Sequence, residues 1–416
     1  MKVFKFGGAS VKDADSVKNT GEIIRACDGD LVVVVSAMGG MTNLFEELVR
    51  HYFRNEEEKW QIFKQAKSFH LNIGIELFGS EERVPVKINS LFEELEAHLQ
   101  KPPSRRYDYE YDQLICYGEL LSTTIISCFL NETGIANNWV DIRTCLKTDD
   151  TYREAKVNWD DTNSLIPGSF NFVDTNLYLT QGFIASTIEN SSTSLGREGS
   201  DFTGAIIANI LDAEYLAIWK DVPGVLNADP KLLPATQMLN ELSYREAIEM
   251  SHSGAKIIHP KTIKPLQNKN IPLYVKSFLD PGSEGTLIHN VGYILELMPV
   301  YIIKQNQVLI TLSPVDFSFV GIGHAAKVLK HFTGIHVRVN LFQLSAIDLN
   351  LVVDMPENGI EDIIAELAKT YEVKYNSGLE MVTIRYYTDE VIAGYTKGRR
   401  VYIEQTTRRT ARIVLK

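Results

Sequence analysis

The sequence predicts an α/β protein with a mostly parallel sheet covered by helices, followed by a smaller α+β region. Three observations predict this fold class. Strand and helix signals alternate over about the first 290 residues, as they do along a covered parallel sheet. The run Leu-Val-Val-Val-Val at residues 31–35 is typical of a strand buried on both faces. After residues 285–298 the strands become longer and alternate more clearly, which predicts a domain boundary near residue 295.

The expected elements follow one another in a regular order. In the first region we expect strands at residues 2–6, 31–35, 177–186, 215–219 and 272–276. We expect helices at residues 15–26, in several pieces over 43–100, and at 111–130, 201–211, 243–251 and 261–267. The second region is expected to contain strands at 308–312, 336–341, 349–354 and 382–386, with helices at 324–331 and 360–370.

The composition is that of an ordinary globular protein, with 44% hydrophobic and 23% charged residues among 416. A formal charge of −11 argues against a general polyanion binder, so no nucleic-acid partner is expected. The four cysteines form no CxxC pair and fit buried thiols in a reducing compartment. Residues 31–45 are the longest charge-free apolar stretch and are shorter than a bilayer span. The N-terminus lacks a signal-peptide pattern, so we expect a cytoplasmic protein without membrane association.

Three glycine-bearing loops, at residues 6–10, 36–40 and 196–201, each follow an extended segment and precede a helix. In an open α/β sheet such loops meet at the carboxyl ends of the strands, where ligands bind. Their N–H groups and helix N-termini suit phosphate. Three ordinary tight turns would produce the same pattern, so on pattern alone both interpretations stay open. A GxGxxA string at 321–326 lies in the second region and is interpreted as a strand-to-helix turn.

Two large classes of phosphotransferase are excluded by missing motifs. The sequence has no GxxxxGK[ST], the phosphate-binding loop of many nucleotide hydrolases. It also has neither HRD nor DFG, which protein kinases need.

Six motifs resemble those of the aspartate kinases, within the amino acid kinase family. They are Lys-Phe-Gly-Gly-Ala-Ser at 5–10, Met-Thr-Asn-Leu at 41–44, Gly-Glu-Leu-Leu-Ser at 118–122, Leu-Gly-Arg-Glu-Gly-Ser-Asp-Phe-Thr at 195–203, Trp-Lys-Asp-Val-Pro-Gly-Val at 219–225 with Asp-Pro at 229–230, and Gly-Ala-Lys-Ile-Ile-His-Pro at 254–260. The first resembles KFGGTS, with Ala9 in place of Thr. The fourth resembles GRGGSDxT, with Glu198 in place of Gly. The last resembles GAKVLHP. The chain is therefore identified as a monofunctional aspartate kinase, and at this length we expect no fused homoserine dehydrogenase domain.

The resemblance implies the fold, the domains and the reaction. We expect an amino acid kinase catalytic domain at 1–295 and an ACT-like regulatory region at 296–416. Its first module is expected at about 305–375, and a second, truncated module at about 376–416. The implied reaction transfers the ATP γ-phosphoryl group to the β-carboxylate of L-aspartate. That carboxylate has a pKa of about 3.9 and is already ionised, so the difficulty is repulsion between two anions. Catalysis should therefore consist of positioning and charge neutralisation.

The resemblance also implies a role for individual residues. The expected catalytic residues are Lys5, Asp201 and Lys256. The expected aspartate-binding residues are Ser36, Thr42, Glu119, Arg197 and Ser200. The expected nucleotide-binding residues are Gly7, Gly8, Ser10, Trp219, Lys220, Asp221, Val225, Asn227, Asp229, Lys256 and Ile257. The expected cofactors are ATP and Mg²⁺, which enters on the ATP phosphates; no metal ligand is identified.

Three features keep further questions open. Glu198 adds negative charge beside Arg197, which would weaken aspartate binding unless its carboxylate points away. Lysine-inhibited relatives have acids near Asn340 and Ala346, and neither acid is present, so weak or absent lysine inhibition is expected. The family also implies a homodimer through the ACT-like region. The competing hypotheses are a kinase for glutamate, acetylglutamate or a nucleoside monophosphate, and an inactive amino-acid sensor that kept the fold.

Overall fold

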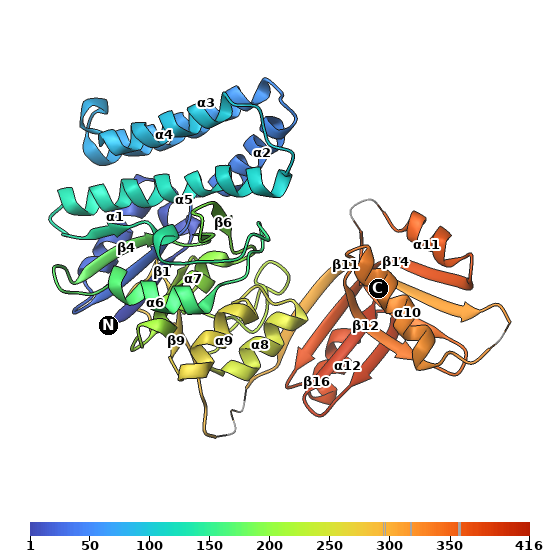
Figure 1. Cartoon of the computed structure of the whole chain (residues 1–416). Helices are drawn as coiled ribbons and strands as arrows, with labels where there is room; N and C mark the ends of the chain where they lie inside the picture. The colour runs from blue at the N-terminus through green and yellow to red at the C-terminus, as the bar shows by residue number, and fades with distance from the viewer. Residues whose placement is uncertain (294, 296, 317, 357–358) are drawn as a thin grey trace. The chain divides into compact units, whose positions relative to one another are not determined.

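The computed structural model describes residues 1–293, 295, 297–316, 318–356 and 359–416, and the chain falls into two compact units (Figure 1). The N-terminal unit comprises Met1–Val225, Met238–Ile248 and Lys256–Leu295. The C-terminal unit comprises Leu226–Gln237, Glu249–Ala255 and Glu296–Lys416. Two short segments from the first 295 residues thus pack with the C-terminal unit. Residue 296, at which the second domain was expected to begin, lies outside the described residues.

An eight-stranded sheet forms the centre of the N-terminal unit, in the order β3-β4-β2-β1-β7-β9-β10-β8. Its strands are β1 (Lys2–Phe6), β2 (Leu31–Val35), β3 (Asn138–Val140), β4 (Leu177–Gln181), β7 (Leu216–Lys220), β8 (Glu241–Ser243), β9 (Leu273–Ser277) and β10 (Thr286–His289). All neighbours are parallel except β9 and β10. Every residue of β2 is buried, as its β-branched run predicted. The fold class is confirmed: the carboxyl ends of β1, β2, β4, β7 and β9 share one edge.

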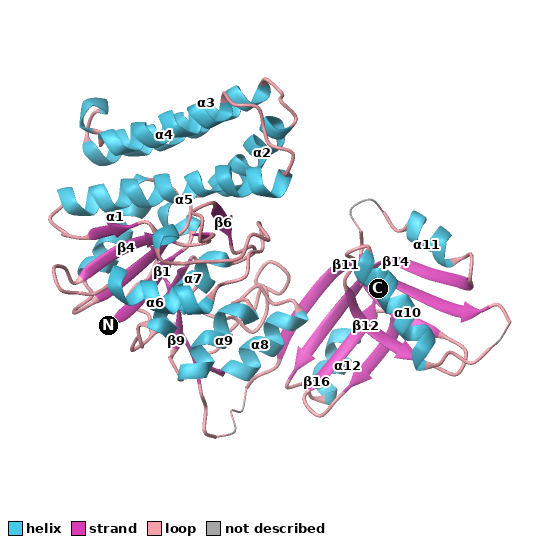
Figure 2. Ribbon diagram, viewed as in Figure 1, coloured by secondary structure: helices cyan, strands magenta, loops and turns pink. Residues whose placement is uncertain are grey.

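Helices cover this sheet (Figure 2). They are α1 (Ala14–Arg25), α2 (Met41–Phe53), α3 (Glu58–Phe78), α4 (Val86–Leu99), α5 (Tyr107–Glu132), α6 (Trp159–Ser169), α7 (Gly199–Ile210), α8 (Tyr244–Ser253) and α9 (Pro260–Lys269), with short 3₁₀ turns at Gly8–Val11, Glu81–Arg83 and Ile142–Thr144. In the described part of the chain, α5 alone is long and apolar enough to cross a membrane, with a mean hydropathy of 1.4. However, 83% of its apolar window is buried, since it packs between the sheet and the outer helices α2, α3 and α4. It is the core helix of this unit.

The single strand expected at 177–186 is two strands in the structure. β4 ends at Gln181, and a hairpin of β5 (Ile184–Ser186) and β6 (Ser192–Ser194) follows. The chain turns at Gly182, where an added Cβ would lie 2.4 Å from the Cβ of Ser200. Strands β3, β8 and β10 and helix α6 were not predicted; the three strands have only three or four residues, too few for a clear periodicity.

The C-terminal unit contains a six-stranded sheet in the order β12-β13-β11-β14-β16-β15. Its elements are β11 (Val300–Pro314), α10 (Ile322–Gly334), β12 (Val339–Leu344), β13 (Leu349–Asp354), α11 (Glu361–Leu367), β14 (Tyr371–Arg385), α12 (Asp389–Thr396), β15 (Val401–Thr406) and β16 (Thr410–Leu415). The GxGxxA string, predicted to be a strand-to-helix turn, is the N-cap Gly321 and the first residues of α10.

Two modules overlap in this sheet because β11 and β14 run through both. Residues 307–312 of β11 pair with β13 and belong to the first module. Residues 300–304 pair with 381–385 of β14, whose other edge pairs with β16. The second module, expected to begin near residue 376, thus takes one strand from before the first module. A register shift between Lys304 and Leu309 separates the two halves. The sequence could not reveal this strand, because its partner lies about 80 residues further along the chain.

Candidate active site

The centre of the site is an ion pair between Lys5 on β1 and Asp201 in the first turn of α7. Lys5 Nζ lies 2.6 Å from Asp201 Oδ1, and the two side chains are only 10% and 4% exposed. Burial by itself would raise the pKa of Asp201, but the nearby Lys5, Lys220 and Lys261 ammonium groups outweigh it and lower that pKa. Asp201 is therefore a carboxylate that holds cations together, and the structure brings together the two residues that the sequence singled out first.

Two further lysines join this centre. Lys220 ends β7 and donates from Nζ to the carbonyl oxygen of Ile257. Lys261 lies in the first turn of α9 and donates from Nζ to the carbonyl oxygen of Leu195 at 2.9 Å. Sequence analysis missed Lys261. A signal was available, since a lysine in the first turn of a helix opposes the helix dipole and needs another reason to be there.

Lys256, the second lysine expected from the motif, is not brought to the ion pair. Its side chain is exposed and has no polar partner among the described residues. Lys220 and Lys261, rather than Lys256, are the additional cations that lower the pKa of Asp201. The catalytic and nucleotide-binding roles expected of Lys256 stay predictions, since its exposed ammonium group lies away from the ion pair and has no partner in the described part of the chain. The loop after Ala255 turns the Ile257 carbonyl, and not the Lys256 side chain, toward Lys220.

Glu198 joins two loops of the site. It lies in the left-handed region, at φ 54°, immediately before α7. This conformation favours glycine, which explains the glycine of the family motif at this position. Its carboxylate Oε2 accepts the backbone N–H of His259 at 2.7 Å. One carboxylate oxygen is thus occupied by a backbone donor, and the effect of Glu198 on aspartate binding stays a prediction.

The loop before α7 is consequently fixed at two points, by Leu195 and by Glu198, to the start of α9. His259 Nδ1 accepts the N–H of Lys261 at 3.2 Å and completes the contact. Burial lowers the pKa of Lys261, while the Glu154, Glu198 and Asp201 carboxylates oppose this change. We refer to the contacts of Leu195 and Glu198 with residues 259–261 as the loop clamp.

Glu119 is buried on α5 beside the second glycine-bearing loop. Its Oε1 accepts the N–H of Ala37 at 3.3 Å, and its Oε2 has no hydrogen-bond partner. Burial raises the pKa of Glu119 to about 8, against weaker opposing effects of the Ala37 N–H and Lys5. A carboxylate in this setting requires a cation, and the free oxygen shows that the protein itself does not supply one within bonding distance.

The remaining aspartate-binding candidates lie after β2, in the first turn of α2 and around the start of α7. Ser36 follows β2 and accepts the Ser122 hydroxyl through its carbonyl oxygen at 2.8 Å. Thr42 is half-buried in the first turn of α2. Ser200 is buried in the first turn of α7, whose N-cap is Glu198. Arg197 is exposed and has no polar partner among the described residues, so its guanidinium is available to a ligand.

The first glycine-bearing loop approaches the second very closely. A Cβ on Gly8 would lie 2.8 Å from the Ala37 carbonyl oxygen, so only glycine fits there. A Cβ on Gly7 would lie 3.6 Å from Lys5 Nζ, which places the ammonium beside that turn. Ser10 is fully buried and its hydroxyl donates to the Trp219 carbonyl oxygen at 3.4 Å. The Ser10 side chain thus serves the fold, and the nucleotide-binding role expected of Ser10 stays a prediction.

The expected nucleotide residues from Trp219 onward belong to both compact units. Trp219 is 4% exposed and stacks on Phe6 at 5.8 Å, so its ring belongs to the core and cannot stack on a base. Asp221 is exposed. Val225 is buried and donates its N–H to Thr286 Oγ1 at 2.8 Å.

Asn227 and Asp229 belong to the C-terminal unit. There the Asn227 amide bonds the Pro299 carbonyl oxygen and the Gln237 N–H, and Asp229 accepts the N–H of Lys231. The Trp219 ring and the Asn227 amide are thus engaged within the protein, and the nucleotide-binding role expected of the whole set stays a prediction.

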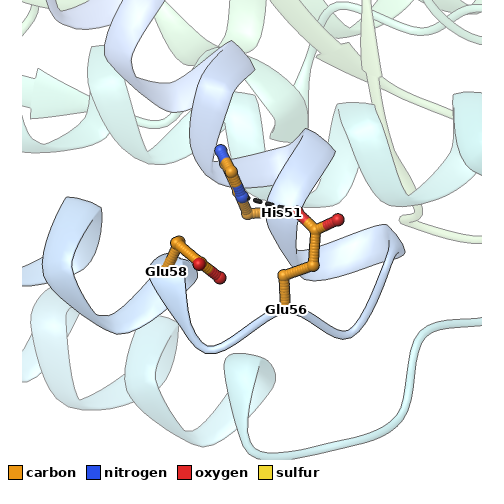
Figure 3. Close-up of side chains that lie close together, drawn as sticks. All are labelled: His51, Glu56 and Glu58. Atoms are coloured by element: carbon orange, nitrogen blue, oxygen red, sulfur yellow. Dashed lines mark ion pairs between the residues drawn. The ribbon is translucent and has the colours of Figure 1, made fainter.

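A separate group of His51, Glu56 and Glu58 lies at the turn between α2 and α3 (Figure 3). His51 Nδ1 is 2.6 Å from Glu56 Oε2, and His51 Nε2 is 3.9 Å from Glu47. These ion pairs close the turn, and Glu58 is exposed. Within the described residues it is the one group of three with metal-ligand spacing, but its contacts are accounted for by the turn.

Fold and site together define a class of protein: an α/β protein that gathers cations, N–H donors and an uncompensated acid at the carboxyl edge of a parallel sheet. The model of the amino acid kinase family matches residues 1–277, and the chain belongs to that family. The lysine-sensitive aspartokinase 3 of Escherichia coli is 28% identical over 394 residues, covering 92% of this chain and 86% of the relative.

The solved structure of E. coli aspartokinase III with aspartate and ADP is similar over the whole chain. It has a TM-score of 0.82 and 26% identity, and the match covers 96% of that structure. The bifunctional aspartokinase/homoserine dehydrogenase 1 of Zea mays is 30% identical over 69% of this chain, which spans only 32% of that relative. The amino acid kinase fold and the aspartokinase-like arrangement expected from the sequence are confirmed.

Proposed function

We propose that this protein is an aspartate kinase, which transfers the ATP γ-phosphoryl group to the β-carboxylate of L-aspartate. The observation that carries the proposal is the buried Lys5–Asp201 pair, with Lys220 and Lys261 beside it, at the edge where the glycine-bearing loops meet. The acceptor and the donor are both anions, so bringing them together is the main electrostatic cost. A converging group of ammonium ions reduces that cost without any general base.

Asp201 orients these cations. Its carboxylate fixes Lys5 Nζ beside Gly7, from where the ammonium can contact the transferred phosphoryl group. The N–H groups of Gly7 and Gly8 approach the phosphates without interference from a side chain. In the reaction a β-carboxylate oxygen of aspartate attacks the γ-phosphorus, the bond to the β-phosphate oxygen breaks, and ADP leaves with the bonding electron pair. No proton transfer is required.

Aspartate is recognised by two groups of opposite charge. The unpartnered Oε2 of Glu119 accepts the α-ammonium group of the substrate. The unpaired guanidinium of Arg197 binds the α-carboxylate in a bidentate manner. A substrate with an ammonium and a carboxylate on the same carbon satisfies both, which favours an amino acid over a nucleoside monophosphate.

Mg²⁺ accompanies ATP in this proposal. It would neutralise phosphate charge, as it does in most phosphoryl transfers, and Mg²⁺ usually keeps several waters and few protein ligands. The donor set fits this role, because Asp201 is already paired with Lys5 and Asp221 is the exposed acid at the end of β7. We assign the metal to the nucleotide and to no cage of protein side chains.

We also propose a homodimer through the C-terminal unit and a location in the cytoplasm. β12 is an edge strand of the six-stranded sheet, and Phe342 and Leu344 on it are 48% and 38% exposed. Unpaired edges with apolar side chains are suited to pairing with a second copy. All four cysteines are free thiols, as is usual in a reducing compartment. Sedimentation of the wild type and of Phe342→Glu tests the dimer.

The proposed function is tested by aspartate-dependent ADP release, with hydroxylamine to trap the acyl phosphate. Glutamate, acetylglutamate and UMP are the alternative acceptors, at equal concentration. Trapped product with aspartate and at least a hundredfold less with the others supports the proposal. Turnover with another acceptor would instead indicate a kinase for that acceptor. Binding of aspartate without ADP release would indicate an inactive amino-acid sensor.

A further inference from the structure

A small polar cavity lies within the C-terminal unit, and of the residues discussed above it includes Asn340. Its volume is about 50 Å³, and it is lined by residues of β12, β14 and β16, by Arg338 immediately before β12, and by the last turn of α8: His252, Ser253, Arg338, Val339, Asn340, Met381, Thr383 and Arg412. All of them belong to the same compact unit. A single water needs roughly 10–15 Å³, so the cavity has room for a group of several heavy atoms.

The cavity contains a buried hydroxyl that has no partner. Thr383 is 1% exposed, and its Oγ1 makes no hydrogen bond within the described residues. Buried hydroxyl groups are nearly always hydrogen-bonded, and an exception requires a water or a ligand. Because Thr383 lines the cavity, the missing partner belongs inside it.

Positive charge dominates the lining. Arg412 lies directly across from Thr383 in the register of β14 and β16, is half-buried, and makes no hydrogen bond or ion pair in the described part of the chain. Arg338 is exposed and uses one of its donors on the His252 carbonyl oxygen at 2.6 Å. A guanidinium carries five N–H donors, so most of those on both arginines remain for a ligand. None of the lining residues is an acid.

The neighbouring acids are already engaged elsewhere. Glu249 lies 3.6 Å from Arg385. Asp354 accepts the amides of Gln307 and Asn340 and lies 3.7 Å from Lys304. Asn340 in turn accepts Lys304 Nζ at 2.7 Å. The protein therefore supplies no counter-charge of its own to Arg412.

We propose that this cavity is an oxyanion site: it binds the carboxylate or phosphate group of a small molecule between Arg412, Arg338 and the Thr383 hydroxyl. Guanidinium donors in a fork, together with one hydroxyl donor, match the geometry of both groups. The proposal does not depend on the reaction catalysed by the N-terminal unit. The site adjoins Ser253, three residues before Lys256 in the sequence, so an occupant contacts the segment that leads into the loop holding Lys220.

The test uses the full-length protein with inorganic phosphate as the probe. Thermal unfolding is followed against sodium phosphate, and against sodium chloride at matched ionic strength, with Mg-ADP at saturation so that the nucleotide site cannot respond. The variants are Thr383→Val, which removes the hydroxyl at nearly constant volume, and Arg412→Met. Arg408→Met is the matched control, because Arg408 is exposed in the turn that joins β15 and β16.

Phosphate should raise the unfolding midpoint of the wild type and of Arg408→Met beyond the effect of chloride. The apparent Kd for phosphate should increase at least tenfold in Arg412→Met and severalfold in Thr383→Val. Replacing phosphate by acetate then decides whether phosphate or carboxylate binds more tightly. If Arg412→Met is too unstable to measure, Arg412→Lys is used instead, because it keeps the positive charge but lacks the paired N–H donors of a guanidinium group. Equal phosphate dependence in all proteins, or no effect beyond that of chloride, would overturn the proposal.

Discussion

Glu198 accepts the backbone N–H of His259 at 2.7 Å although it occupies a position in the left-handed region that favours glycine. A non-glycine residue there costs about 1 kcal/mol. The hydrogen bond from the buried loop to a charged acceptor is worth about as much or more. Arg197 lies between the two contact points of the loop clamp, Leu195 and Glu198.

Replacing Glu198 by Gly should raise the KM for aspartate about tenfold and leave the KM for ATP nearly unchanged. Glycine removes the backbone strain but also the acceptor that fixes the Arg197 loop. Glu198→Gln keeps a carbonyl acceptor for the His259 N–H and should restore most of the aspartate affinity. Steady-state kinetics of the three proteins measures both constants. An unchanged KM for aspartate in Glu198→Gly would show that the clamp does not position Arg197.

Lys261→Met should reduce kcat/KM for the phosphoryl transfer more strongly than Lys256→Met. Lys261 is half-buried and acts on Asp201, whereas Lys256 is exposed. We expect a loss of about tenfold to a hundredfold for Lys261→Met, typical of removing one group that stabilises transition-state charge. Lys264→Met is the control, since Lys264 is exposed on the same helix. A larger loss of kcat/KM in Lys256→Met than in Lys261→Met would instead indicate Lys256 as the second catalytic lysine.

Lys5→Ala should lower turnover by a factor on the order of a thousand, since it removes the ammonium closest to the reacting groups. It also leaves Asp201 buried without its partner, so unfolding must be measured in parallel. Asp201→Asn should lower turnover as well while preserving the side-chain shape. Lys18→Ala, at a half-exposed lysine of α1, is the control for loss of charge. A loss below tenfold for Lys5→Ala would refute the assigned role.

Aspartate binding should strengthen as the pH rises from 6 toward 9. The carboxyl group of Glu119 has a pKa of about 8 in the folded protein, so below that pH it must lose a proton before it can accept an ammonium group. The KM for aspartate should therefore fall with pH, with a midpoint near 8, and binding at pH 7 should release a proton. Glu119→Gln should raise the KM and abolish this pH dependence. Calorimetry in buffers of different ionisation enthalpy counts the protons.

The same group predicts a stability effect of opposite sign. A carboxyl pKa raised above its unfolded value of about 4.5 means that the folded state holds the proton longer than the unfolded state. The unfolded state alone is ionised between the two pKa values, so stability falls as the pH rises from about 4.5 to 8. Glu119→Gln should consequently unfold at a higher temperature than the wild type at pH 8, and the difference should shrink near pH 4. If the difference in Tm between Glu119→Gln and the wild type were the same at pH 8 and at pH 4, the raised pKa of Glu119 would be contradicted.

Lysine at low millimolar concentration should inhibit weakly or not at all. Asn340 stands where lysine-inhibited relatives were expected to carry an acid, and its carbonyl oxygen is occupied by Lys304 Nζ at 2.7 Å. A second ammonium group would meet an existing one. Asn340→Asp should increase sensitivity to lysine only if Lys304 is also replaced, for example by Met. Inhibition curves of the wild type and of both variants check this, and strong inhibition of the wild type would show the expectation to be wrong.

The sequence by itself determined the strands β1, β2, β4, β7 and β9 of the sheet, the three glycine-bearing loops and the first two residues of the site. Lys5 lies on a buried strand before a double-glycine turn, and Asp201 lies in the first turn of a helix. Both are patterns of neighbouring residues, which can be recognised in the sequence without the structure. Glu119 was also visible, because a carboxylate in an apolar run of a helix requires a partner.

Only the tertiary structure decided which lysine stands beside Asp201, what Glu198 bonds and where the second module obtains its first strand. Each depends on a contact between segments that are tens of residues apart, such as Lys261 with Leu195, or residues 300–304 with β14. The direction of a single side chain is fixed by these distant contacts, so Lys256 and Lys261, five residues apart, could be distinguished only after the loop between α8 and α9 was placed.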